Sequence, residues 1–448
     1  MTYSSISMLP MLLMILLLAL EHTSEGIEYH VKPTDPEVTQ CPVQPCHTLA
    51  EYLENSTWDN TSHARVVFMP GHHRVAQSFR VRYAFNLTLL GSTRVNHTLH
   101  DTRPILHIST IWFHKIINLN LTGIIVIKSY ELEQAFSNSA LKFANIFNLR
   151  VSQIALHSTR VGITIDNVFG NSVIEQSSFK YGLAQISILS IYCPLSVDKS
   201  VCAIIQSLHV HLSYHHKISI RDCIFESGST SMHVALNSFP LEIDISNIVT
   251  HGKQQKQISL IASSKTPYMV RIRDSLLESN GIGIGILISS YSFSANQKIQ
   301  ISNCTLAGHT TGIEIIVDSQ HKNNQIVVTH AAPEIEIKRT TIRDNSLKMS
   351  DQRGIGLMVS CGDKYSQPSI MLKNVLFTST VNRRLSAILP SVVYMEFAQN
   401  VSFVDCSFTG NRGTPIVAIS SHFNVSGRIT FVNNTVRVVL LHFMMIAS

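Results

Sequence analysis

The chain has 448 residues, a formal net charge of +6 and 14% charged residues, against about 25% in ordinary soluble domains. Its Lys and Arg residues occur singly or in pairs, without a basic run or interleaved aromatic residues, which excludes nucleic acid as an expected partner. The low charge density suits strands stacked on copies of themselves, because like charges would otherwise recur at every level.

Residues 1–26 have the features of a secretory signal peptide. An apolar stretch from Met8 to Leu20 precedes the small residues Ser24 and Gly26, at the positions that signal peptidase prefers. We therefore expect a secreted, extracellular or cell-surface protein.

Residues 27–63 are expected to form an N-terminal cap. Thr48 and Glu51 have the spacing of a capping box, which predicts a short helix. Such a helix would cover the open end of the coils that follow. Residues 64–190 look like degenerate coils, in which His72 and His73 are expected to lie in a turn because they follow Pro-Gly.

An eight-residue pattern then occurs eight times: apolar, any, apolar, any, Asp or Asn, any, any, apolar. Successive copies start 25 to 36 residues apart, at Ile218, Ile243, Val270, Ile299, Ile335, Ile370, Val401 and Ile429. The alternation predicts a strand with one face in a core. Asp and Asn tolerate left-handed backbone angles, so the fifth position predicts a turn. Its residues are Asp222, Asn247, Asp274, Asn303, Arg339, Asn374, Asp405 and Asn433.

A second apolar run follows each turn at a nearly constant distance, for example from Gly281, Thr311, Gly354 and Pro415. Each unit therefore contains at least two short strands, and no segment of helical periodicity separates them. We predict an all-β, single-domain right-handed parallel β-helix over residues 64–448, with regular coils from about residue 218. A β-sandwich would not place one residue class at one position eight times.

These repeats resemble the right-handed parallel β-helix proteins of the pectin-lyase-like superfamily. The segments from Leu276 (LLESNGIGI) and Phe408 (FTGNRGTPI) also look like repeats of bacterial polymorphic surface proteins. The N-terminal Cys pair, the sequons and the degenerate coils are similar to secreted β-helix proteins of simple animals. The resemblance implies the fold, whereas the activity stays open because this fold carries many functions.

Seven of the eight cysteines divide into two kinds, and Cys361 has no obvious partner in the sequence. Close pairs in polar segments predict small disulfide-closed loops, at Cys41 with Cys46 and at Cys193 with Cys202. Three others share one position of the repeat in coils that are not adjacent, and we expect buried thiols at Cys223, Cys304 and Cys406.

Nine N-x-S/T sequons agree with a secretory route. Two of them, Asn303 and Asn433, occupy the turn position, where we expect neighbouring coils to cover the side chain and prevent glycosylation. The remaining candidates for glycosylation are Asn55, Asn60, Asn86, Asn96, Asn120, Asn400 and Asn424.

Candidate active-site motifs are incomplete. Polygalacturonase-like members of the superfamily combine D-D, G-H-G and R-I-K motifs, whereas this chain offers His251-Gly252 and Arg271 without a D-D pair. Glu242 and Asp244 lie at outward positions of one strand and are expected to be solvated. A polar surface patch, instead of a metal site, is expected at His209, His211, His215 and His216. We assign no catalytic residue, no metal and no cofactor.

Two functions follow from this sequence. The first is a secreted or cell-surface glycoprotein whose non-catalytic β-helix serves recognition, adhesion or matrix structure, with an extracellular carbohydrate or protein as ligand. The alternative is a polysaccharide lyase or glycoside hydrolase. The apolar residues after Arg437 are too few to span a bilayer. They are consistent either with a cut-short membrane anchor or with a chain that continues into further coils, so membrane attachment stays open.

Overall fold

A computed structural model describes most of the chain from residue 26 to residue 436. The described residues are 26–34, 46–91, 103–128, 139–158, 161–180, 184–190, 216–228, 230–236, 241–252, 255–262, 268–281, 283–290, 297–317, 334–345, 355–361, 368–381, 392–396, 400–413, 417–420, 423–426, 428 and 430–436. Residues 1–25 of the predicted signal peptide and residues 437–448 lie outside them.

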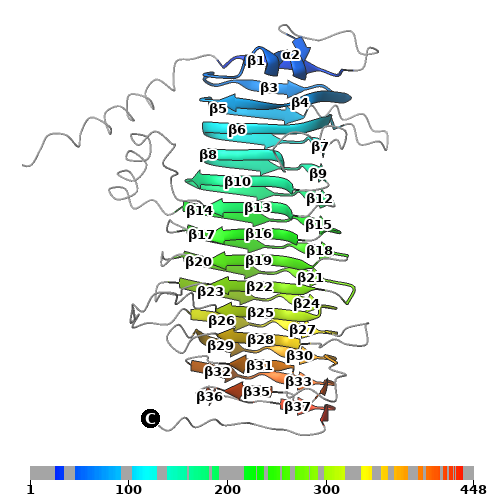
Figure 1. Cartoon of the computed structure of the whole chain (residues 1–448), viewed down its shortest axis with the longest axis vertical. Coiled ribbons are helices and arrows are strands. Elements are labelled where there is room, and N and C mark those ends of the chain that lie inside the picture. The colour runs from blue at the N-terminus through cyan, green and yellow to red at the C-terminus, as the bar shows by residue number, and fades with distance from the viewer. Residues whose placement is uncertain are drawn as a thin grey trace, which may run out of the picture.

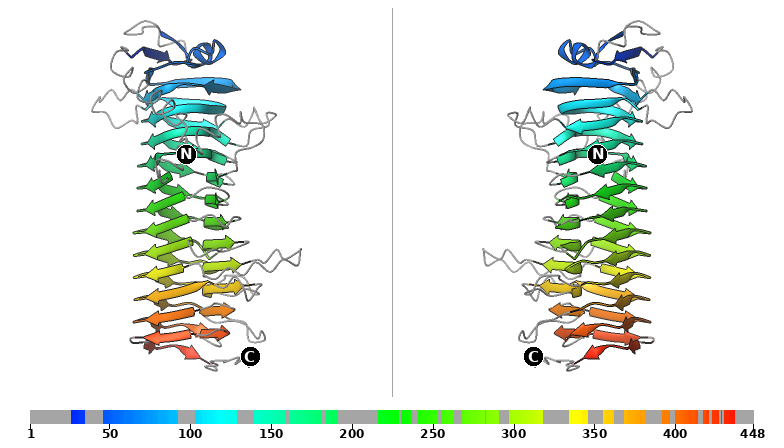
Figure 2. Two further views of the ribbon diagram at one scale, coloured as in Figure 1. Left: turned by 90° about the vertical axis from the view of Figure 1, so that its left-hand side faces the viewer. Right: turned by 90° about the vertical axis from the view of Figure 1, so that its right-hand side faces the viewer.

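The described part of the chain is a parallel β-helix, a column of coils in which each strand pairs in parallel with its counterpart one coil away (Figure 1). Three stacks of strands run along the column, as the strand labels in Figure 1 show, and Figure 2 shows the same column from two further sides. The first stack contains β1 (Glu28–Lys32), β3 (Arg65–Phe68), β5 (Phe85–Gly91), β11 (Asn171–Glu175), β14 (His216–Arg221), β17 (Leu241–Ser246), β20 (Tyr268–Arg273), β23 (Gln297–Ser302), β26 (Glu334–Lys338), β29 (Ser369–Lys373), β32 (Asn400–Val404) and β36 (Phe423–Ser426).

The short strands that follow the repeat turn form the second stack, and the second apolar run of each unit forms the third. The second stack contains β7 (Ile125–Lys128), β9 (Ala155–His157), β12 (Ser178–Lys180), β15 (Ile224–Glu226), β18 (Val249–His251), β21 (Leu276–Glu278), β24 (Thr305–Ala307), β27 (Thr341–Arg343), β30 (Leu376–Thr378), β33 (Ser407–Thr409) and β37 (Thr430–Val432). The third contains β10 (Val161–Phe169), β13 (Ala184–Ser190), β16 (Thr230–Leu236), β19 (Lys256–Ala262), β22 (Ile284–Ser290), β25 (Thr311–Val317), β28 (Ile355–Cys361), β31 (Val393–Glu396) and β35 (Val417–Ser420). A small separate pair joins β34 (Arg412–Gly413) to β38 (Thr435–Val436).

The interior consists of aliphatic and aromatic side chains in register. Ile301 of β23, for example, pairs with Ile272 of β20 and with Ile337 of β26, and all three are fully buried. Phe377 and Phe408 stack with ring centroids 4.9 Å apart. Thr250 interrupts the apolar eighth position of the repeat, but it is also buried and its hydroxyl accepts a hydrogen bond from the backbone of Glu278. The predicted alternation of the repeat therefore places its apolar residues in one continuous core.

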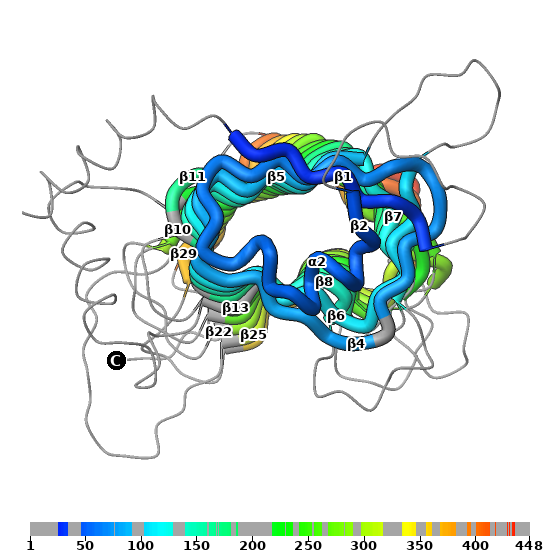
Figure 3. Tube along the Cα trace, turned by 90° about the horizontal axis from the view of Figure 1, so that it is seen from above, coloured from blue at the N-terminus to red at the C-terminus, as the bar shows by residue number. Residues whose placement is uncertain are grey.

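The predicted capping helix is present as α2 (Leu49–Glu54), which follows β2 (Cys46–Thr48). Thr48 and Glu51 form both hydrogen bonds of the capping box. The helix buries Leu49, Tyr52 and Leu53, and it lies with β1 and β2 at the N-terminal end of the coils (Figure 3). It is the one helix in the described residues, and it is too short to cross a membrane.

The N-terminal coils differ from the regular ones because single strands continue around corners of the column. β4 (His72–Arg82) runs through the second and third stacks, β6 (Ile105–Thr122) through all three, and β8 (Ser139–Ser152) through the third and first. The predicted turn at His72 and His73 is therefore wrong. Both residues begin β4, and His73 is fully buried with its Nε2 atom 2.8 Å from the Met69 carbonyl oxygen.

Candidate functional site

The outer face of the third stack carries a cluster of cations on the N-terminal coils. Arg80 of β4, Trp112 of β6 and Lys142 of β8 occupy one outward column, since Arg80 pairs in register with Trp112 and Trp112 with Lys142. Arg82 lies two residues after Arg80, and Lys115 follows Trp112 at the next corner. We call the four cations and Trp112 the basic surface.

The indole of Trp112 lies between two cations. The Arg80 guanidinium carbon is 3.4 Å from the centroid of the ring, and the Lys142 ammonium is 4.8 Å from it. Each contact of this kind stabilises by about 0.5–1 kcal/mol at an exposed site. Because cations occupy the ring, Trp112 does not offer a free face for stacking on a sugar. It holds Arg80 and Lys142 in fixed outward positions.

His114 lies beside this cluster on β6 and is uncharged near neutral pH. Burial, together with the charges of Lys115 and Arg80, lowers the pKa of His114 to about 4. Its ring makes an edge contact with Trp112, and its Nε2 atom is 3.2 Å from Nδ2 of Asn145. The positive charge of the basic surface therefore comes from Arg and Lys. Two carboxylates lie close to it: Asp166 of β10 is 3.2 Å from the Lys142 ammonium, and Asp59 accepts the backbone N–H of Arg82.

An apolar stripe borders the basic surface at the corner between the third and first stacks. Phe85 pairs with Ile117 and Ile117 with Phe147, at outward positions of three successive coils. Tyr83 is 52% exposed and Ile117 45% exposed, and the Lys115 ammonium lies 5.2 Å from the Tyr83 ring. Exposed rings beside fixed cations form a surface suited to ligands that carry both flat apolar faces and negative charge.

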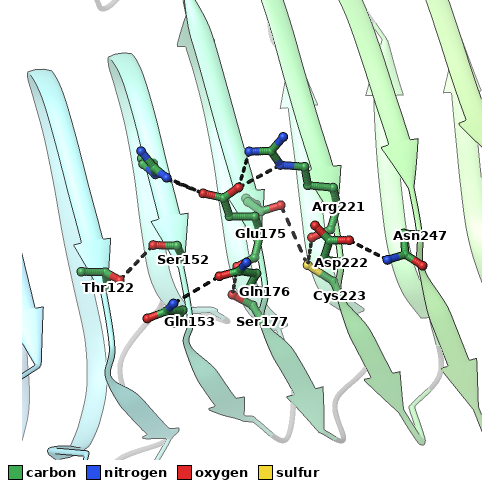
Figure 4. A network of polar contacts seen from close by, with 12 residues as sticks. Thr122, Ser152, Gln153, Glu175, Gln176, Ser177, Arg221, Asp222, Cys223 and Asn247 are labelled. Carbon is green, nitrogen blue, oxygen red and sulfur yellow. Dashed lines mark hydrogen bonds and ion pairs between the residues drawn. The ribbon is translucent and has the colours of Figure 1, made fainter. Parts of the chain in front are cut away.

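The outer face of the first stack is occupied by ion pairs between coils. Glu175 of β11 binds Arg150 of the coil before it, at 2.7 Å, and Arg221 of the coil after it (Figure 4). Burial alone would raise the pKa of Glu175, but hydrogen bonds from Arg221 and Arg150 lower it overall. This arrangement stabilises the charged carboxylate and is structural.

Glu242 and Asp244 belong to the same face, and their expected solvation is wrong. Asp244 is buried and accepts two hydrogen bonds from Arg273, at 3.0 and 2.9 Å. Glu242 binds Arg271 and lies 3.3 Å from Lys217 of the preceding coil. Arg271 and Arg273 are thus engaged by carboxylates one coil away.

The eight residues at the fifth position of the repeat all have positive φ angles, including the exception Arg339, at 46°. Amide and carboxylate groups of this column bond along the stack, as from Nδ2 of Asn247 to Asp222 (Figure 4) and from Nδ2 of Asn303 to Asp274, both at 2.6 Å. The side chains of this column are exposed. The expectation that neighbouring coils cover Asn303 and Asn433 is therefore wrong. Upstream, Gln153 and Gln176 occupy the same column and have the same backbone conformation.

The partial hydrolase motif does not assemble, because its parts lie on different faces. His251 ends β18 in the second stack, whereas Arg271 lies on β20 in the first. His251 pairs in register with Glu226 and its Nδ1 atom lies 3.5 Å from the Glu278 carboxylate. Glu226 and Glu278 also bind Lys180 and Arg343, at 3.0 and 3.6 Å. Within the described residues no group of three or more His, Cys, Asp or Glu side chains could hold a metal ion.

The remaining candidates are partly described. Cys223, Cys304 and Cys406 are buried free thiols, as predicted, and burial raises the pKa of Cys223 to about 12. Cys46 is buried in β2, but both disulfides stay predictions because Cys41, Cys193 and Cys202 lie outside the described residues. Asn96 and the histidines at 209, 211 and 215 also lie outside them, and His216 begins β14. Asn55, Asn60 and Asn400 are exposed, Asn86 and Asn120 are half-buried, and Asn424 lies in β36.

No family model and no curated protein sequence matches the chain. Solved structures resemble it at low sequence identity, among them the following three. A mannuronan C-5 epimerase A-module from Azotobacter vinelandii is 10% identical, with 87% of this chain and 94% of that chain covered and a TM-score of 0.38. A tailspike protein of an Escherichia coli bacteriophage, in complex with a pentasaccharide, is 9% identical, with 94% and 76% covered and a TM-score of 0.43.

A mannuronic acid specific polysaccharide lyase from human gut microbiota is 8% identical, with 91% of both chains covered and a TM-score of 0.36. The present chain is a parallel β-helix by its own strand pairing. The fold follows from the strand register of the chain itself, and the neighbours assign no activity to it.

Proposed function

We propose that this protein is a secreted or cell-surface glycoprotein whose β-helix binds an acidic carbohydrate without catalysis. The observation that carries the proposal is the basic surface, where Trp112 fixes Arg80 and Lys142 at outward positions on alternate coils. Adjacent coils lie ~4.8 Å apart, so the cations follow the column at regular intervals. A polymer with repeated acidic groups would engage several of them at once, which strengthens weak individual contacts.

The neighbouring aromatic residues support a carbohydrate rather than a simple anion as the ligand. Tyr83 is 52% exposed and lies against Lys115 at the edge of the basic surface. Aromatic rings present large apolar faces on which sugar rings pack, and phenolic hydroxyls add a polar contact. The combination places stacking and charge recognition within the same few coils.

The state of the carboxylates on the first stack supports the absence of catalysis there. A general acid in glycoside hydrolysis needs a raised pKa. In Glu175, Asp244 and Glu336 burial acts in that direction, but hydrogen bonds from Arg or Lys side chains lower each pKa overall. These carboxylates are thereby kept ionised and are occupied by their partners.

The proposal is tested by removing charge from the basic surface. The double variant Arg80→Gln/Lys142→Gln should bind an immobilised acidic polysaccharide about tenfold more weakly, a loss of ~1.4 kcal/mol. Binding of the wild type should decrease with added salt, because exposed charges are screened. Lys373→Gln removes an exposed cation from β29 on a distant coil and should leave binding unchanged. Equal binding by the wild type and the double variant would refute the proposal.

A second candidate function, a polysaccharide lyase or hydrolase, is favoured by the row of Glu226, His251 and Glu278 on consecutive coils. The two carboxylates lie two coils apart, roughly 10 Å, close to the separation of an inverting pair of catalytic carboxylates. The test is to incubate the protein with a panel of polysaccharides and measure product. Activity abolished by Glu226→Gln or Glu278→Gln would support the enzyme, and no product from any substrate would exclude this pair.

A further inference from the structure

Two sequons lie beside the basic surface. Their sequences give no reason to prefer one of them as a glycosylation site, but their asparagines differ in exposure and hydrogen bonding. One is Asn60-Thr61-Ser62, in the turn that precedes β3, and the other is Asn86-Leu87-Thr88, within β5. An N-linked glycan is bulky and hydrophilic, so a glycosylated chain folds only where the asparagine side chain can stay in solvent. Exposure and hydrogen bonding of the two asparagines therefore indicate which one can carry a glycan.

Asn60 meets this condition. It is exposed, has a φ angle of 57°, and donates its backbone N–H to the carbonyl oxygen of Arg82 at 3.0 Å. The preceding residue, Asp59, accepts the backbone N–H of Arg82 at 2.6 Å. The turn is thus held by the Asn60 backbone and the Asp59 side-chain carboxylate, and neither contact involves the Asn60 side chain. Ser62, the hydroxyl residue of this sequon, is also exposed.

Asn86 is instead the first member of an amide ladder. Its Oδ1 atom accepts a hydrogen bond from Nδ2 of Asn118, and Oδ1 of Asn118 accepts one from Nδ2 of Asn148, at 2.5 and 2.9 Å. The ladder ends where Oδ1 of Asn148 accepts the backbone N–H of Asn171. At its start, Nδ2 of Asn86 lies 3.2 Å from Nδ1 of His63.

A sugar on Nδ2 of Asn86 would replace one of the two amide hydrogens and place a bulky group against His63. Asn86 is half-buried, and Leu87 next to it is fully buried in the core. The glycan would therefore disturb the first rung of the ladder and the packing of β5. A polar group that loses its hydrogen-bond partner in the folded state destabilises that state, so modified chains would fold poorly.

We propose that the folded protein carries an N-glycan on Asn60 and none on Asn86. The inference rests on the secretory route in the proposed function. The glycan would stand at the N-terminal edge of the basic surface, next to Arg82, and would leave Lys142 on the opposite side open.

The test is to express the full chain in animal cells behind an added cleavable leader and to measure the mass of the secreted protein before and after enzymatic deglycosylation. Ser62→Ala removes the first sequon and Thr88→Ala the second, and both keep the asparagine. We expect Ser62→Ala to lose one glycan and Thr88→Ala to lose none, with its melting temperature unchanged. A glycan lost from Thr88→Ala, or retained in full by Ser62→Ala, would overturn the assignment.

Two further measurements keep this outcome separate from the proposed function. A glycopeptide map of the wild-type protein reads occupancy at Asn60 and Asn86 directly, even where a variant folds poorly, and an occupied Asn86 contradicts the inference. Expression without the added leader tests whether the chain enters the secretory pathway by itself. Retention inside the cell would contradict the secreted location in the proposed function, while the leader-driven protein still decides between the two sequons.

Discussion

A charge placed inside the column should unfold it, and Ile301→Asp is the sharpest form of this perturbation. Ile301 is fully buried between Ile272 and Ile337 of the adjacent coils. Losing its burial costs about 1.5–3 kcal/mol. A carboxyl group without a partner in that position costs several kcal/mol more, whether it stays charged or takes up a proton. The sum is a large part of a typical stability of about 5–15 kcal/mol.

The matched control is Ser302→Asp, one position further along β23. Ser302 points outward and pairs in register with Arg273 on one side and Lys338 on the other. The same new carboxylate would lie between two cations there and should change the free energy of unfolding by less than about 1 kcal/mol. Chemical denaturation followed by circular dichroism, together with resistance to proteolysis, measures both variants. If the two are equally stable, the inward and outward assignment of β23 is wrong.

Two further predictions concern stability. His309 is fully buried, and burial lowers its pKa to about 4 from the ordinary 6.5. Between these pH values the unfolded chain binds a proton at His309 that the folded chain does not. The contribution of neutral His309 to the free energy of unfolding is therefore fully present above pH 6.5, and it decreases by about 3 kcal/mol as the pH falls to 4. His309→Gln should flatten this slope in denaturation curves measured across that range, and an unchanged slope would assign the acid sensitivity to other groups. Arg339 has a φ angle of 46°, a left-handed conformation that Asn tolerates better than Arg. Arg339→Asn should therefore raise the melting temperature by the equivalent of roughly 0.5–1 kcal/mol. A lower melting temperature would contradict this account of the turn.

The regular coils could be predicted from the sequence because their pattern is local. The apolar positions and the turn position all lie within one eight-residue pattern. Even Arg339, which is neither Asp nor Asn, takes the backbone conformation of the other residues at the turn position. The capping helix followed from Thr48 and Glu51 for the same reason. Short-range alternation and turn chemistry are sufficient wherever each strand ends within a few residues.

The basic surface could not be predicted in this way, because it depends on register between coils. Arg80, Trp112 and Lys142 are about 30 residues apart and meet only when β4, β6 and β8 are aligned. These strands continue around corners, so the repeat that would have set the register is not visible in the sequence. The same reason explains why Asp244 was expected to be solvated, since its partner Arg273 belongs to the next coil.

The ion pairs on the first stack make the order of the coils specific. Glu242 and Asp244 form ion pairs with Arg271 and Arg273 of the following coil, and Glu175 binds both Arg150 and Arg221. A tandem copy of the β17 coil would set carboxylates against carboxylates, which destabilises paired strands. Lineages that lengthen this protein by duplicating a single coil must therefore also change its outward charges, whereas duplication of a complementary pair of coils preserves the alternation at once.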